Sequence, residues 1–326
     1  MLAALVALVL AAPAASADSA AALAALPLVL RAEQSYVAAE GVAPLVEVAG
    51  VASDAFGHVW ATDAGAHRLV RWDAGGAWIG ECGALGSDAN QFRRPTGLAR
   101  LGSLGIAVLD VENRRVVAYD QLGRLTDLVV ALDAPALESA TGRIAPVALA
   151  ADRGGALYVA DADRDRLVAF DFSGRFLRVL GGYGTAPGSF HGLAALAVAP
   201  RGELVTLERP LPARRRKGAA ADSGGAPARV QWLDGSGSPL TSWTFDAGSA
   251  RDFALAVDDS GRVALSLSGG RTDEVRVYSR GGVLLASETG VPAPRALAFA
   301  PGGALLVAES GAARVRRFAL APARGE

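Results

Sequence analysis

The stretch Leu157-Tyr158-Val159-Ala160-Asp161, followed by Arg166-Leu167-Val168-Ala169-Phe170-Asp171, decides the fold of this chain. It consists of an apolar run that ends on an acid, a turn, and a second apolar run that begins with Arg. Val59 to Asp63 with Arg68 to Asp73 repeats this pattern closely. The four looser copies are Ile106 to Asp110 with Arg115 to Asp120, Leu204 to Glu208 with Arg229 to Leu233, Val263 to Ser266 with Val275 to Tyr278, and Leu305 to Glu309 with Arg314 to Phe318.

The six copies recur about every 49 residues, and an aromatic residue closes the Arg-led run of each. A period of 40 to 50 residues with four strand-like segments is typical of propeller blades. We therefore predict an all-β fold, a six-bladed β-propeller of four-stranded antiparallel blades. The acid positions are Asp63, Asp110, Asp161, Glu208, Ser266 and Glu309, and the aromatic positions are Trp72, Tyr119, Phe170, Trp232, Tyr278 and Phe318.

The last copy lacks a fourth strand, because only Ala321 to Glu326 follow its third strand, Arg314 to Leu320. The segment Leu26 to Ala39 precedes the first copy and can supply that strand. Pairing it with the last blade would close the ring and remove an exposed strand edge. We expect the innermost strand of each blade to be a short apolar run: Val48 to Ser53, Gly97 to Arg100, Val147 to Ala151, Ala194 to Ala199, Phe253 to Val257 and Ala296 to Ala300.

The composition restricts the class of partner. The formal net charge is -1, with 32 basic and 33 acidic residues along the chain. This balance gives no basic field for nucleic acid or an anionic membrane, so we expect no nucleic-acid partner. Lys217 is the only lysine, and the excess of Ala, Gly and Arg indicates a bacterial genome rich in G and C.

The N-terminus has the pattern of a secretory signal. Residues 1–17 combine an apolar run with Pro13 and the small residues Ala15-Ser16-Ala17 before Asp18, although no basic residue precedes Arg31. A misassigned start or an uncleaved anchor is the alternative. Beyond it we expect an N-terminal segment at 18–44, the propeller at 45–320 and a tail at 321–326, with no membrane span in the mature chain. These features predict a secreted or periplasmic monomer.

The repeats resemble those of the NHL family. The resemblance is carried by Gly155 to Asp161, Arg166 to Asp171 and Gly181-Gly182-Tyr183-Gly184 to Ser189-Phe190, and by Gly65 to Val70, where His67 takes the family's histidine position. It covers about 275 residues and implies a six-bladed NHL-type propeller. Similar propellers include amidating lyases with several axial histidines and lactonases that hold calcium with Glu, Asn and Asp. This chain has three histidines and two asparagines and lacks both sets.

The regular acid and Arg residues are interpreted as structural. Repetition argues for a structural task, because a catalytic set breaks the symmetry of a repeat. We expect no catalytic residues, metal site or cofactor. One free histidine cannot make a zinc site, and no Gly-x-Ser-x-Gly elbow is present. The expected structural pairs are Asp63 with Arg68, Asp110 with Arg115, Asp161 with Arg166, and Glu309 with Arg314.

Departures from the repeat are the better places to seek function. One is the insertion at 210–227 in the fourth copy, where Arg214-Arg215-Arg216-Lys217 is followed by a Gly- and Ala-rich run. It is either a docking or processing loop or a neutral insertion. A second is the fifth copy, where Ser266 stands at the acid position and the following turn is longer.

A third departure is a set of basic residues at connections between blades. Arg93, Arg94 and His191 follow outer strands, and Arg251 and Arg295 enter from later blades. They either surround an axial mouth that attracts anions or solvate the rim. We expect an exported, non-enzymatic scaffold that binds another envelope or extracellular protein. The alternative is small-anion or carbohydrate-derivative binding, or lyase or hydrolase activity, at this mouth.

Overall fold

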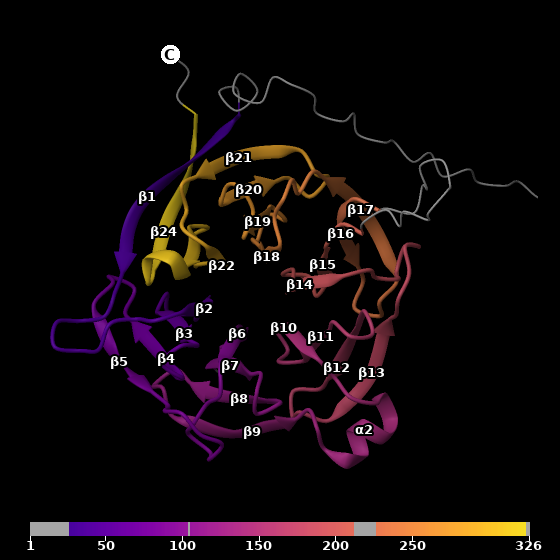
Figure 1. Cartoon of the computed structure of the whole chain (residues 1–326), viewed down its shortest axis with the longest axis horizontal. Helices are drawn as coiled ribbons and strands as arrows, with labels where there is room; N and C mark the ends of the chain where they lie inside the picture. The colour runs from indigo at the N-terminus through magenta and orange to yellow at the C-terminus, as the bar shows by residue number, and fades with distance from the viewer. Residues whose placement is uncertain (1–25, 104, 212–225, 324–326) are drawn as a thin grey trace, which may run out of the picture.

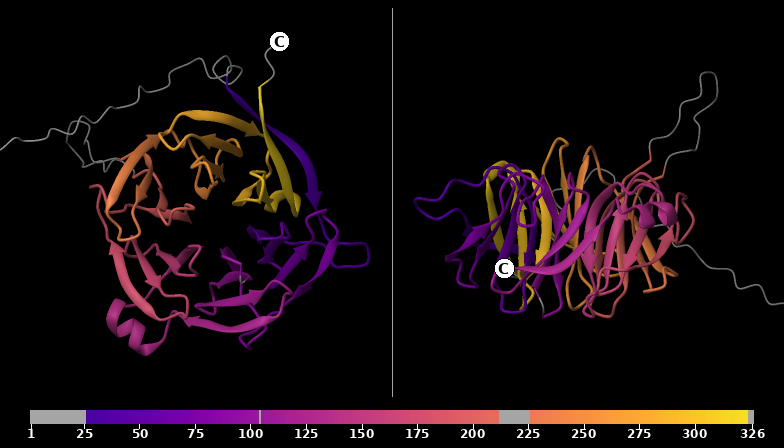
Figure 2. Two further views of the ribbon diagram at one scale, coloured as in Figure 1. Left: turned by 180° about the vertical axis from the view of Figure 1, so that it is seen from behind. Right: turned by 90° about the horizontal axis from the view of Figure 1, so that it is seen from below.

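The computed structural model describes residues 26–103, 105–211 and 226–323. They form six separate four-stranded antiparallel sheets arranged as a ring (Figure 1). The prediction of a six-bladed β-propeller is confirmed. Seen from the side, the ring is a short cylinder whose strands run between two faces (Figure 2).

Each blade contains four strands in order from the axis outward. The first three blades are β2 (Val48–Ser53), β3 (Val59–Asp63), β4 (Arg68–Trp72), β5 (Trp78–Cys82); β6 (Pro95–Leu101), β7 (Gly105–Asp110), β8 (Arg115–Asp120), β9 (Leu125–Ala131); and β10 (Pro146–Ala151), β11 (Leu157–Asp161), β12 (Arg166–Phe170), β13 (Phe176–Gly181). Blades four and five are β14 (Leu193–Val198), β15 (Leu204–Glu208), β16 (Ala228–Leu233), β17 (Pro239–Phe245); and β18 (Asp252–Val257), β19 (Val263–Ser268), β20 (Glu274–Tyr278), β21 (Leu284–Thr289). The sixth is β22 (Pro294–Phe299), β23 (Leu305–Glu309), β24 (Arg314–Pro322), β1 (Leu28–Tyr36). The short helix α2 (Pro135–Thr141) joins blades two and three, and the 3-10 turn η1 (Ser310–Ala312) follows β23.

The N-terminal strand closes the ring, as predicted. β1 lies antiparallel to β24, from Leu28 opposite Pro322 to Tyr36 opposite Val315 (Figure 1). The Trp72 indole then donates a 2.8 Å hydrogen bond to the Val37 carbonyl, which ties the end of β1 to blade one. The closing strand therefore joins the first blade to the last.

The core lies in the six gaps between blades. Each of the six buried hydrophobic clusters combines residues from two neighbouring blades. The aromatic residues that close the third strands are all buried in these gaps. The conspicuous aromatic of each repeat therefore holds blades together, since a single sheet cannot bury both of its faces alone.

One glycine marks a close approach between blades. A Cβ on Gly50 in β2 would overlap the carbonyl oxygen of Thr96 in β6. The Thr62 hydroxyl donates a 2.9 Å hydrogen bond to the same carbonyl. No side chain larger than hydrogen fits at this contact.

In the fifth blade, the acid position of the repeat falls on Leu267 and not on Ser266, so the predicted alignment was wrong by one residue. Leu267, opposite Glu274, occupies the place that Asp63, opposite Arg68, has in blade one. Ser266 lies one position earlier, opposite Val275. Blade five has thus exchanged an acid and Arg for Leu267 and Glu274, and Glu274 instead pairs with Arg276 at 2.5 Å. None of the described helices is long and apolar enough to cross a membrane.

Candidate functional site: the two ends of the axial channel

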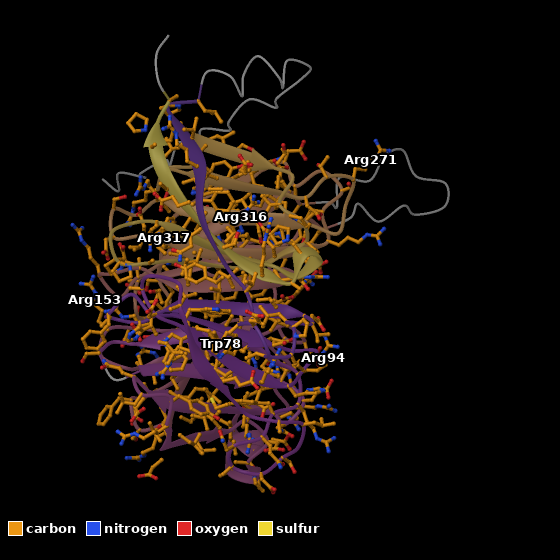
Figure 3. The ribbon with its side chains drawn as sticks, turned by 90° about the vertical axis from the view of Figure 1, so that its left-hand side faces the viewer. Trp78, Arg94, Arg153, Arg271, Arg316 and Arg317 are labelled. Carbon is orange, nitrogen blue, oxygen red and sulfur yellow. The ribbon has the colours of Figure 1, made fainter. Side chains whose placement is uncertain are left out.

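The blades leave a channel along the axis with two different ends. At the hairpin end, first strands turn into second strands and third strands into fourth. At the connection end, second strands turn into third strands and each blade passes to the next. Figure 3 shows the propeller edge-on, with Arg153 of the hairpin end on one face and Arg94 and Arg271 of the connection end on the other.

Alternate residues of the six innermost strands line the channel in three layers, as the two-residue period of a strand requires. We call the middle layer the waist; it lines both the cavity toward the hairpin end and the cavity toward the connection end. The waist is Val51, Leu98, Leu149, Leu196, Leu255 and Leu297. The layer toward the hairpin end is Ser53, Arg100, Ala151, Val198, Val257 and Phe299. The layer toward the connection end is Ala49, Thr96, Val147, Ala194, Phe253 and Arg295.

The hairpin end contains the larger cavity, of about 860 Å³. This volume lies in the range of small-molecule sites, roughly 300–1,000 Å³. Its floor is the apolar waist, and charged residues of the first turns stand around its rim. Two of the rim acids are engaged, because Asp258 pairs with Arg262 at 2.6 Å and Asp259 with Arg153 at 3.1 Å.

Arg100 differs from every other residue of its layer, since it alone is charged. Its Nε donates a 2.9 Å hydrogen bond to the Gly102 carbonyl. Within the described residues, no carboxylate forms an ion pair with its guanidinium. Arg100 ends one of the inner strands predicted from the sequence, but it was not among the predicted binding residues. The signal was available, because Arg100 lies two residues after Leu98 on the axial side of that strand.

The connection end contains a cavity of only about 120 Å³. Of the five basic residues expected around an axial mouth, Arg295 alone lines this cavity. It forms a 2.7 Å ion pair with Asp252. Among the described residues, the connection end therefore offers no concave site where several arginines converge.

The other members of the predicted mouth lie apart. Arg94 is exposed and pairs with Glu47 at 3.0 Å and Glu112 at 3.9 Å. Arg93 and Arg251 are also exposed and line neither cavity. Glu47 and Glu112 hold Arg94 at the rim. This favours the interpretation that Arg93, Arg94 and Arg251 are solvated surface residues and not part of an anion site.

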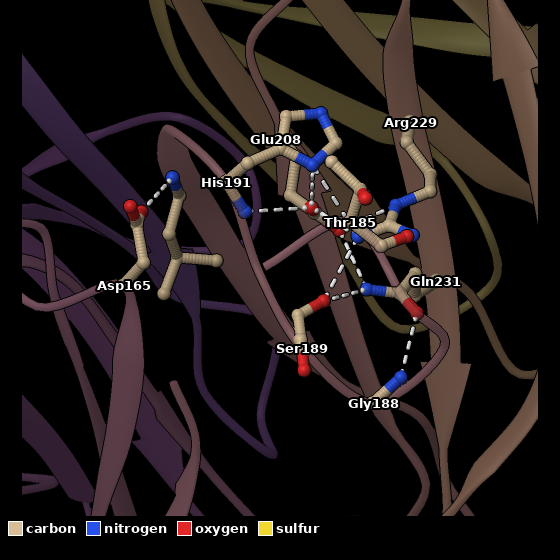
Figure 4. A network of polar contacts seen from close by, with 9 residues as sticks. Asp165, Thr185, Gly188, Ser189, His191, Glu208, Arg229 and Gln231 are labelled. Carbon is tan, nitrogen blue, oxygen red and sulfur yellow. Dashed lines mark hydrogen bonds and ion pairs between the residues drawn. The ribbon is translucent and has the colours of Figure 1, made fainter. Parts of the chain in front are cut away.

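His191 is buried next to Glu208 and Arg229 of blade four and does not line the channel (Figure 4). Its Nδ1 lies 3.0 Å from Glu208 Oε2, and its backbone N–H donates to the same oxygen. Glu208 also accepts hydrogen bonds from Arg229 and from Gln231 at 2.6 and 2.7 Å. The same Nδ1 also lies 3.4 Å from the Arg229 guanidinium, and the buried Nε2 has no hydrogen-bond partner in the described part of the chain.

Acid and Arg side chains form a buried ion pair in five blades. The carboxylates are fully buried and face guanidinium groups that are mostly covered. The pairs are Asp63 with Arg68 (3.1 Å), Asp110 with Arg115 (3.0 Å), Asp161 with Arg166 (2.8 Å), Glu208 with Arg229 (2.6 Å) and Glu309 with Arg314 (2.7 Å).

In the first four blades, these pairs fasten the segment that enters the blade. The Asp63 carboxylate accepts backbone hydrogen bonds from Val46 and Glu47, on the segment that enters blade one. Arg68 donates to the Ala43 and Pro44 carbonyls of the same segment. Asp161 accepts a 3.0 Å bond from the Ala145 N–H in the same way. The acid and Arg therefore satisfy backbone groups of the segment that enters the blade.

Arg214, Arg215, Arg216 and Lys217 lie outside the described residues. Burial raises the pKa of the Cys82 thiol to about 11, so this thiol is protonated at neutral pH. Across the described ranges, no three His, Cys, Asp or Glu side chains are grouped to hold a metal ion.

Comparison with known proteins shows the fold only. No family model and no curated protein sequence matches the chain. A streptogramin B lyase structure aligns at 13% identity over 90% of this chain and 98% of its own, with a TM-score of 0.56. A gluconolactonase from Xanthomonas campestris aligns at 15% identity, covering 90% and 97%, with a TM-score of 0.57. The WD40 propeller domain of Doa1 aligns at 12% identity, covering 89% and 96%, with a TM-score of 0.55.

Proposed function

We propose that this chain is an exported, NHL-type propeller that binds another envelope or extracellular protein, without catalysis, through the outer edge of blade three. The observation that supports this is the apolar exposure of β13 and the turn before it. Phe172 and Leu177 are 72% and 52% exposed, and Phe176 and Val179 are also exposed. Concentrated exposed apolar side chains are typical of protein interaction sites.

The backbone of β13 adds a second attraction for a partner. β13 is the outermost strand of its sheet and pairs only with β12, so its other edge is unpaired. Natural proteins protect such edges with charges, prolines or bulges. Here the one charged residue within the strand is Arg178, which bonds to the Gly235 carbonyl of blade four at 2.6 Å, and one irregularity in the pairing with β12 lies at Leu177. An extended segment with apolar side chains fits this edge by strand addition.

Capture from the secreted and envelope fractions of the native host tests the proposal. The double variant Leu177→Lys with Val179→Lys places charge on the β13 edge. Leu240→Lys with Ser242→Lys is the matched control, since both residues are exposed at the same spacing on the outermost strand of the next blade. We expect a partner that the wild type and the control recover and the β13 variant loses.

Two results would reject the proposal at different levels. Equal recovery by all three proteins would remove β13 as the site. Recovery of no specific protein would remove the protein-binding function. Export is tested separately, by N-terminal sequencing of the protein from those fractions, and a mature chain beginning at Asp18 is expected.

A further inference from the structure

The hairpin-end cavity carries features that the proposed protein-binding function does not use. It is far larger than the cavity at the opposite end, about 860 Å³ against about 120 Å³. It opens on the face of the first turns, whereas the β13 edge lies on the outer side of blade three. We infer that this cavity is a binding site for an anionic amphiphile, a medium-chain carboxylate, with its head at Arg100.

The shape and lining select an apolar tail. Below Arg100, the waist surrounds the axis with a complete ring of Val and Leu side chains. Strand residues rise about 3.3 Å each, so this ring lies about 7 Å deeper than the Arg100 layer. Val198, Val257 and Phe299 continue the apolar wall at the level of Arg100. A chain entering along the axis would contact aliphatic or aromatic groups on several blades at once.

The charges select an anionic head. Arg262 and Arg153 are paired with Asp258 and Asp259, whereas Arg100 has no ion-pair partner among the described residues. The Arg100 Nε donates a hydrogen bond to the Gly102 carbonyl in its own turn, so the two terminal nitrogens can bind a carboxylate.

One further acid lines the cavity and opposes an anion. Asp152 accepts a 2.9 Å hydrogen bond from the Ala156 N–H, so one of its oxygens is engaged in its own turn. Its negative charge is expected to weaken binding without abolishing it. The opposite end provides a natural comparison, because Arg295 occupies the corresponding layer there but is neutralised by Asp252.

Isothermal titration calorimetry with decanoate tests the site on the full chain. We expect saturable binding to the wild type, much weaker binding of decanol, and none of decyltrimethylammonium, whose head carries the opposite charge. Arg100→Gln should weaken decanoate binding about tenfold or more, because a charge-assisted hydrogen bond is lost. Arg100 is exposed, so this variant is expected to fold normally.

Two further variants set the controls. Arg295→Gln changes the same residue type at the connection end and should leave decanoate affinity unchanged. Asp152→Asn should tighten binding severalfold, since it removes the opposing charge. The inference is overturned if no saturable binding is seen below about 1 mM decanoate. It is also overturned if Arg100→Gln has no effect, or if Arg295→Gln weakens binding as much. None of these results bears on capture through β13.

Discussion

The two ends of the axial channel are built from the same six strands but are stabilised differently. At the connection end, ion pairs with fully buried carboxylates tie the backbone between blades, and little space remains. At the hairpin end, the guanidinium groups of the ion pairs are partly or largely exposed, the turns are short, and the cavity is wide. The repeated acid and Arg residues therefore belong to the end that holds the ring together, whereas Arg100, at the end with space for a ligand, has no charged counterpart in its layer.

The largest expected effect separates the two ends by stability. Asp161→Ala at the connection end leaves Arg166 buried without its carboxylate and frees the Ala145 N–H. We expect a loss of about 3–5 kcal/mol in the free energy of unfolding. Asp259→Ala at the hairpin end removes an exposed partner of Arg153 and should cost less than about 1 kcal/mol. Urea unfolding monitored by Trp fluorescence measures both, and equal losses would contradict the comparison.

A smaller effect is expected at the waist that divides the two cavities. Leu149→Ala removes a buried side chain from the ring and should cost about 2 kcal/mol, the lower end for such a change, because open space already borders the side chain. Val147→Ala, in the same strand but partly exposed at the connection end, should cost less than about 0.5 kcal/mol. Urea midpoints that do not differ between the two variants would argue against a packed waist.

The smallest effect is a pH dependence at the hairpin end. Arg280 donates two 2.8 Å hydrogen bonds to Glu203 and thereby lowers the pKa of that carboxyl, against the opposing effect of burial. A lowered folded pKa stabilises the fold above the ordinary carboxyl range and loses this contribution as the pH falls through the folded pKa. Glu203→Gln should therefore cost about 1 kcal/mol or less at pH 7. The difference from wild type should begin to shrink below about pH 4 and disappear only once the pH lies well below the lowered folded pKa of Glu203.

Urea unfolding at both pH values measures this dependence. Asp259→Asn serves as a control with a more exposed pair. A difference between wild type and Glu203→Gln that persists at low pH would show that the Glu203 carboxylate acts by packing and not through its charge.

Much of the fold could be predicted because its determinants repeat. The alternation of short apolar runs and turns located the inner strands to within about two residues, and the missing last strand identified its donor in the N-terminal segment. In the fifth blade, the predicted acid position was wrong by one residue. Its second strand continues to Ser268, and an apolar run alone does not show that Leu267 takes the acid position.

The candidate sites were less predictable. The connections of Arg93, Arg94 and His191 share one face, but the direction of each side chain depends on its local partners. Glu47 and Glu112 hold Arg94 at the rim, and Glu208 holds His191 in a buried network. The period of a strand indicated which residues face the axis, yet the volume between six strands depends on how the whole ring packs.

From the sequence alone we could predict the six blades, the aromatic residue that closes each third strand, the acid and Arg positions of four blades, and the strand that closes the ring. These features follow from local pattern and repetition, which a linear chain records directly. Only the folded ring shows that the wide cavity lies at the hairpin end and that Arg100 stands there without an acidic partner among the described residues. It also showed that the outer edge of blade three is both apolar and open. Each of these depends on residues from several blades meeting in space, and no single repeat contains that information.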